Sequence, residues 1–166
     1  GDEIHWFRPE VAQVKATQAA AEKGNFKVVR IVNNAPETAV VDFNLTRDVL
    51  KDVKVRQALF HAIDRNRIAQ DVYQGLSEPS KNAIPSQFKD LHDDSVDYNK
   101  MYPYDPAKAA ALLDEAGYPI KDGKRFSIEL TVIAKLPYDA VAQVVQSQWS
   151  AIGIDVKLST LDQQIW

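Results

Sequence analysis

Residues 43–65 read FNLTRDVLKDVKVRQALFHAIDR, and this stretch decides how the chain is organised. The stretch begins inside an alternating segment, residues 38–45, which predicts a strand with one apolar face. The alternating apolar residues of that strand are Ala39, Val41, Phe43 and Leu45. After a turn rich in Asp, Lys and Arg, apolar side chains recur at helical spacing over residues 55–63. Asp64 then has the chemistry to cap a second helix, so the stretch predicts a strand, a helix and a further helix.

Composition limits the class of protein before any motif is considered. The chain has 166 residues, of which 45% are hydrophobic and 26% charged, which suits one globular domain with its own core. Its net charge of −3 does not favour nucleic acid or an anionic membrane surface as partners. There are no cysteines, which excludes disulfides and cysteine-based zinc sites.

The first third of the chain predicts further elements. Pro9 suits the first turn of a helix, and the Ala- and Gln-rich residues that follow should continue it until Gly24. Residues 3–7 predict a short strand, and the β-branched residues 26–32 predict a buried one. Residues 77–104 contain three prolines and an acidic run, which indicates a long ordered loop.

The last third of the chain predicts a strand–helix–strand unit. Asp105-Pro106 is a strong helix start, and Gly117 should end that helix. Residues 126–132 alternate as a strand, Pro137 opens a helix that Gly153 closes, and residues 154–158 alternate again. Such a unit is usually a βαβ crossover with parallel strands. The fold class we expect is therefore α/β (mixed α+β), a mixed sheet flanked by helices with a C-terminal βαβ unit.

Four segments resemble one known family. Residues 52–65, DVKVRQALFHAIDR, are similar to its hallmark D-x-R-V-R-Q-A-L-x-x-A-I-D-R, and residues 104–119, YDPAKAAALLDEAGYP, to its second hallmark. Ala83-Ile84-Pro85 resembles the loop between the two hallmarks, and residues 148–156, QWSAIGIDV, a helix-to-strand turn. The family is solute-binding family 5, the extracellular binding proteins of peptide- and nickel-type ABC transporters. One departure is Val49-Leu50, where the family often has Pro-aromatic.

The resemblance implies a receptor built from two lobes that close on a solute. Residues 1–166 would form a single domain, the second lobe of a type II periplasmic-binding-protein-like fold, excised from a longer chain. Its partners would be a peptide-like small solute, the first lobe of the same chain and membrane permease subunits. It would be an extracytoplasmic monomer of a prokaryote, in the periplasm or as a cell-surface lipoprotein.

The candidate binding residues lie in the loop after the strand at residues 126–133. In α/β sheets, ligands bind beyond the carboxyl ends of strands and near helix N-termini. Lys135 could pair with a solute carboxylate, and Tyr138 could stack or donate a hydrogen bond; Leu136 and Asp139 belong to the same loop. Glu37 and Thr38, before an earlier strand, form a weaker second group. The alternative is an exposed loop lysine and a tyrosine that only packs.

Other residues favour structural roles. Ion pairing or helix capping accounts for Arg56 and Asp64. The acidic residues between 90 and 97 indicate a solvated loop rather than a metal site, because the glycine turn of a calcium loop is missing. Tyr102, Tyr104 and Tyr118 indicate packing rather than an aromatic ligand cage.

Nothing in the sequence matches a catalytic or phosphate-binding motif, and we expect neither an enzyme nor a cofactor. The competing hypothesis is a stand-alone α/β enzyme or sensor domain that reuses the fold.

Overall fold

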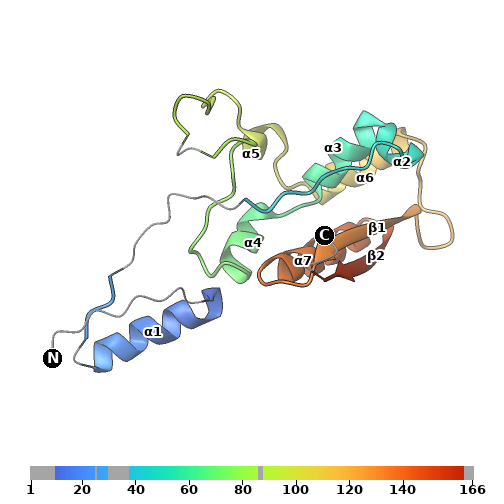
Figure 1. The fold of residues 1–166 in the computed structure, drawn as a ribbon. Helices are drawn as coiled ribbons and strands as arrows, with labels where there is room; N and C mark the ends of the chain where they lie inside the picture. The colour runs from blue at the N-terminus through green and yellow to red at the C-terminus, as the bar shows by residue number, and fades with distance from the viewer. Residues whose placement is uncertain (1–9, 25, 30–37, 86–87, 163–166) are drawn as a thin grey trace.

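The structure is a computed structural model and describes residues 10–24, 26–29, 38–85 and 88–162. Figure 1 shows the order of its elements. They are α1 (Val11–Lys23), α2 (Asp48–Lys51), α3 (Val53–His61), α4 (Arg65–Asp71), α5 (Tyr98–Met101), α6 (Pro106–Glu115), β1 (Phe126–Ile133), α7 (Tyr138–Ala151) and β2 (Ile154–Leu161). No helix among these residues is long and apolar enough to cross a membrane.

The C-terminal βαβ unit is confirmed. Strands β1 and β2 pair in parallel, with Phe126 opposite Ile154 and Ile133 opposite Leu161. Helix α7 connects them and packs on both strands. Its apolar stripe buries Ala142, Val145 and Trp149. The apolar stripe of α7, with its 3.6-residue period, and the apolar faces of the strands, with their two-residue period, therefore pack into one core, as the sequence predicted.

A second layer, the helix pair α3 and α6, lies against this unit (Figure 1). Val55 and Leu59 of α3 and Leu113 of α6 are fully buried in the same core cluster as Trp149. The indole Nε1 of Trp149 donates a hydrogen bond of 3.1 Å to the carbonyl oxygen of Leu59. That bond joins the two layers and satisfies a buried donor that would otherwise cost free energy.

The predicted helix starts are also confirmed. The carboxylate of Asp64 accepts a hydrogen bond from the Arg67 amide at 2.9 Å, which caps α4. Asp105 caps α6 in the same way through the Lys108 amide at 2.8 Å, and Pro106 occupies the first turn. Gly153 follows α7 with a φ of 88°, a conformation that favours glycine. These helix termini are determined by residues close to them in the sequence, which is why the sequence predicts them.

Two predicted strands are wrong in the part of the chain that the structure describes. Residues 26–29 and 38–45 belong to no strand. The sheet formed by the described residues has only the parallel pair β1 and β2, so the expected mixed character is not seen there. Alternation specifies an apolar face, but a strand also needs a neighbour to accept its backbone hydrogen bonds. The predicted strand at residues 3–7 and residues 30–32 of the other lie outside the described residues.

The long loop between α4 and α6 contains one short helix, α5, and is otherwise irregular, close to the prediction. Asn82, which is only 7% exposed, holds this loop together through hydrogen bonds of its side chain. The Asn82 amide nitrogen donates to the Asp93 carbonyl at 2.9 Å, and its amide oxygen accepts from the Ile84 amide at 2.9 Å. One buried side chain thus connects two parts of the loop that are 11 residues apart, which explains how a segment with few regular elements holds a shape.

Candidate functional site

The predicted binding loop, residues 134–139, is a tight connection at the carboxyl end of the sheet. The Ala134 amide donates to the Leu161 carbonyl at 2.8 Å, which extends the pairing of β1 with β2 by one residue. The Tyr138 amide then donates to the Lys135 carbonyl at 2.9 Å, which turns the chain into α7. The loop is therefore fixed at both ends, and its side chains are presented from a defined position.

The start of α7 supplies further polar groups. Asp139 stands in its first turn, and its carboxylate accepts a hydrogen bond of 2.8 Å from the Ala140 amide. Negative charge is favourable at this end of a helix. Lys135 is exposed, and Leu136 is 57% exposed. The loop thus offers a cationic and an apolar side chain to the solvent, with Tyr138 half-buried behind them.

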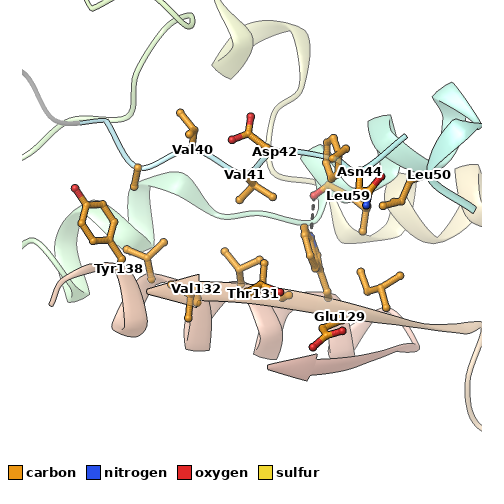
Figure 2. A pocket seen from close by; sticks show the side chains of 18 of the residues that line it. Val40, Val41, Asp42, Asn44, Leu50, Leu59, Glu129, Thr131, Val132 and Tyr138 are labelled. Atoms are coloured by element: carbon orange, nitrogen blue, oxygen red, sulfur yellow. Dashed lines mark hydrogen bonds between the residues drawn. The ribbon is translucent and has the colours of Figure 1, made fainter. Parts of the chain in front are cut away.

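A groove of about 900 Å³ leads away from this loop, and Figure 2 shows it from close by. One side is formed by residues 38–44 and the other by β1. Its apolar lining includes Val141, Val145 and Trp149 of α7. This volume falls within the range of small-molecule sites in proteins.

The groove brings together three of the six predicted site residues. Thr38, Lys135 and Tyr138 all line it, although Thr38 is about a hundred positions away from the other two in sequence. Leu136 and Asp139 lie in the loop but do not line the groove. Glu37 lies outside the described residues.

Several polar side chains of the groove were not predicted as site residues from the sequence. Asp42, Glu129 and Thr131 line it, and Figure 2 shows them on the two facing segments. The signal was present in part: the alternation of β1 places Glu129 and Thr131 on its exposed face. No local pattern shows that residues 38–44 lie opposite them.

The structural readings of the hallmark residues are supported. Arg56 donates through Nη1 to the carbonyl oxygens of Leu50 and Lys51, at 2.7 and 2.8 Å, and so caps the end of α2. Asp64 is a cap rather than an ion-pair partner of Arg56 in the described chain. Burial lowers the pKa of Arg65, whose guanidinium donates to the Tyr102 carbonyl at 2.9 Å.

The tyrosines and the acidic loop also have local partners. The ring of Tyr102 packs on Phe60, and that of Tyr118 on Phe126, whereas Tyr104 is exposed. In the acidic loop, hydrogen bonds from Ser95 lower the pKa of Asp93. Among the described residues, no three acidic or histidine side chains gather closely enough to hold a metal ion.

Comparison with known proteins identifies the class. Residues 4–166 match the family model of bacterial extracellular solute-binding proteins, family 5, middle region. The chain belongs to this family, as its hallmark segments predicted.

Relatives and solved structures agree with this assignment. The chain is 38% identical over 127 residues to the dipeptide-binding protein of Escherichia coli K12, a match covering 74% of this chain and 22% of that protein. It is 35% identical over 136 residues to heme-binding protein A of Haemophilus influenzae, covering 81% and 24% of the two chains. The chain therefore spans about a quarter of the length of these relatives.

Among solved structures, the oligopeptide-binding protein AppA from Bacillus subtilis, in complex with a nonapeptide, is 32% identical with a TM-score of 0.64. That match covers 74% of this chain and 26% of AppA. The periplasmic binding protein DppA from Helicobacter pylori, in complex with the peptide STSA, is 26% identical with a TM-score of 0.64 and covers 74% and 22%. These similarities confirm the predicted fold class, α/β of the type II periplasmic-binding-protein kind.

Proposed function

We propose that this chain is part of the substrate-binding component of an ABC importer, which captures an oligopeptide or similar small solute and delivers it to the membrane permease. Membership of family 5 supports this, as do relatives named for dipeptide and oligopeptide binding. Since the chain spans about a quarter of those relatives, we take residues 1–166 as one of two lobes. The function is binding rather than catalysis, and the protein works as a monomer outside the cytoplasm, in the periplasm or anchored as a lipoprotein.

The observation that carries the proposal is the position of the loop at residues 134–139. It lies at the carboxyl end of two parallel strands, at the N-terminus of a four-turn helix, and beside a groove of about 900 Å³. Ligand sites of α/β sheets occur at such positions. In this proposal Lys135 pairs with a carboxylate of the solute, and Tyr138 and Thr38 contact the solute from either side. Leu136 and Asp139 shape the loop. Glu37 lies outside the described residues, and it is included only because the sequence places it beside Thr38.

Calorimetry on the full-length protein tests this site. We expect Lys135→Ala combined with Tyr138→Ala to weaken binding of a dipeptide or oligopeptide panel by about tenfold or more, which corresponds to one or two lost polar contacts. The melting temperature of the solute-free protein should stay the same, because Lys135 is exposed and its loop backbone is hydrogen-bonded independently of both side chains. Lys89→Ala, an exposed lysine of the distant loop, is the matched control. Unchanged affinity in the double variant would place the site elsewhere.

A further inference from the structure

His92, in the long loop between α4 and α6, has a buried side chain whose two ring nitrogens differ in their surroundings. The side chain is only 5% exposed. Its Nδ1 lies 2.6 Å from the carbonyl oxygen of Ile84, eight positions earlier in the chain. Its Nε2 is also buried, and it makes no hydrogen bond within the part of the chain that the structure describes. One nitrogen of the ring is therefore satisfied and the other is not.

The position of the proton on the ring follows from the partner of Nδ1. A carbonyl oxygen only accepts hydrogen bonds, so a neutral His92 ring must carry its proton on Nδ1. The lone pair of Nε2 is then a buried acceptor without a donor, which costs free energy. A carboxylate oxygen of Asp94 lies 3.4 Å from Nε2, so the neutral ring presents a lone pair to a second acceptor. A proton on Nε2 would turn this contact into a charge-assisted hydrogen bond.

The charged side chains around the ring favour its protonated form. Asp93 and Asp94 follow His92 directly, and Lys81 comes from the facing segment, with its Nζ 3.7 Å from the Asp94 carboxylate. Hydrogen bonds from Ser95 and, to a smaller extent, the charge of His92 lower the pKa of Asp93. Two carboxylates and one ammonium leave net negative charge beside the ring, which opposes the cost of burying a positive one.

The contact between His92 and Ile84 joins two parts of the loop, next to the link made by Asn82. On one side of it, residues 88–92 form a turn, in which the carbonyl oxygen of Phe88 accepts hydrogen bonds from the amides of Leu91 and His92 at 2.9 and 2.8 Å. This turn carries exposed apolar side chains, because Phe88 is 48% and Leu91 71% exposed. The contact of His92 therefore determines how firmly these side chains are held against the rest of the loop.

We propose that His92 is a pH-sensitive latch of this loop. When the ring binds a second proton, Nδ1 still donates to Ile84 and Nε2 donates to Asp94, which completes a chain of contacts from Ile84 to Lys81. Proton uptake and the ordered loop then favour each other. The loop is most stable below about pH 6.5, where histidine is ordinarily charged, and loosens as the pH rises through that range. This inference does not rest on the proposed solute site, since the lining of the groove contains none of the loop's described residues.

Nuclear magnetic resonance on the full-length protein tests the latch. Long-range proton–nitrogen spectra of the His92 ring should show the proton of the neutral form on Nδ1 at about pH 8, and protons on both nitrogens at about pH 5. Protection of the amides of residues 92–98 against hydrogen exchange, corrected for the intrinsic effect of pH, should be about threefold or more higher at the lower pH. A neutral ring with its proton on Nε2, or equal protection at both pH values, would overturn the proposal.

Variants separate the latch from other titrating groups. His92→Asn keeps a side-chain donor for the Ile84 carbonyl but does not titrate, so we expect the pH dependence of loop protection to disappear. Asp94→Asn should reduce it, because the partner of the second proton loses its charge. Asp90→Asn, at an exposed carboxylate of the same loop, is the matched control and should retain the full effect. An unchanged pH dependence in His92→Asn would assign it to another group, such as the buried His61, and would overturn the proposal.

Discussion

Single side chains hold the two layers of this protein together. Leu59 is 0% exposed and Trp149 2% exposed, and the Trp149 indole donates to the Leu59 carbonyl. Both positions could be predicted from sequence, because each lies on the apolar stripe of a helix with clear periodicity. Their hydrogen bond could not be predicted, because it joins residues 90 positions apart. Periodicity specifies which face is buried and leaves open what that face meets.

Truncating either side chain should destabilise the fold. We expect Leu59→Ala and Trp149→Ala each to lower the free energy of unfolding by about 2–5 kcal/mol, through lost burial and the cavity left behind. Denaturant melts measure this. Ser150→Ala, an exposed position next to Trp149 on the same helix, should change the free energy by no more than about 0.5 kcal/mol. Native stability in the two core variants would contradict the packing described above.

Asp155 gives a pH-dependent prediction at the same scale. A hydrogen bond from the Ser127 hydroxyl, followed by Lys124, lowers the pKa of Asp155. Since the folded pKa lies below the unfolded one, the stabilisation is present above the unfolded value and is lost as the pH falls through the folded value. We expect Ser127→Ala to raise the pKa of Asp155 toward the ordinary range, as an NMR titration of its carboxyl carbon below about pH 5 would show. Ser147→Ala is the control, and an equal titration in both variants would rule out the hydroxyl as the cause.

At the scale of elements, local signals were sufficient for the longer helices and for the βαβ unit, whereas the one-turn helix α2 stands where a turn was predicted. Asp64 and Asp105 cap helices through amides three residues away, so the information lies within one turn. Helix α3 begins at Val53, two residues before the predicted start, because Asp52 caps it through the Lys54 amide. The strand predictions at residues 26–29 and 38–45 were wrong in this structure because a strand needs a distant partner.

The loop around Asn82 is an element whose order depends on one residue. Replacing Asn82 by alanine leaves the Ile84 amide and the Asp93 carbonyl without their partner. We expect a loss of about 1–3 kcal/mol in local stability and faster hydrogen exchange over residues 82–98, with α7 and β1 unaffected. Asn66→Ala, at an exposed position of α4, serves as the control. Unaltered exchange in the loop would show that its shape has another origin.

At the scale of the whole molecule, the sequence predicted about half of the candidate site. Lys135 and Tyr138 were found because they follow a strand and begin a helix, and the groove contains both. Asp42 and Glu129 were missed because their place in one groove depends on how residues 38–44 lie along β1. Leu136 was predicted with its neighbours, yet it does not line the groove. A loop is predictable as a unit, while the direction of each side chain depends on the packed structure.

Binding by residues 1–166 alone tests whether the solute site is shared between two lobes. If they supply one side of a site that two lobes complete, this chain should fold cooperatively yet bind a peptide solute of its full-length parent at least about a hundredfold more weakly than the parent does. Half of the contacts give much less than half of the affinity, because the entropy cost of immobilising the solute is met in full. Calorimetry on both proteins, after thermal melts have confirmed folding, measures the difference. Submicromolar binding by the isolated chain would contradict the two-lobe site and would place a complete site within these residues.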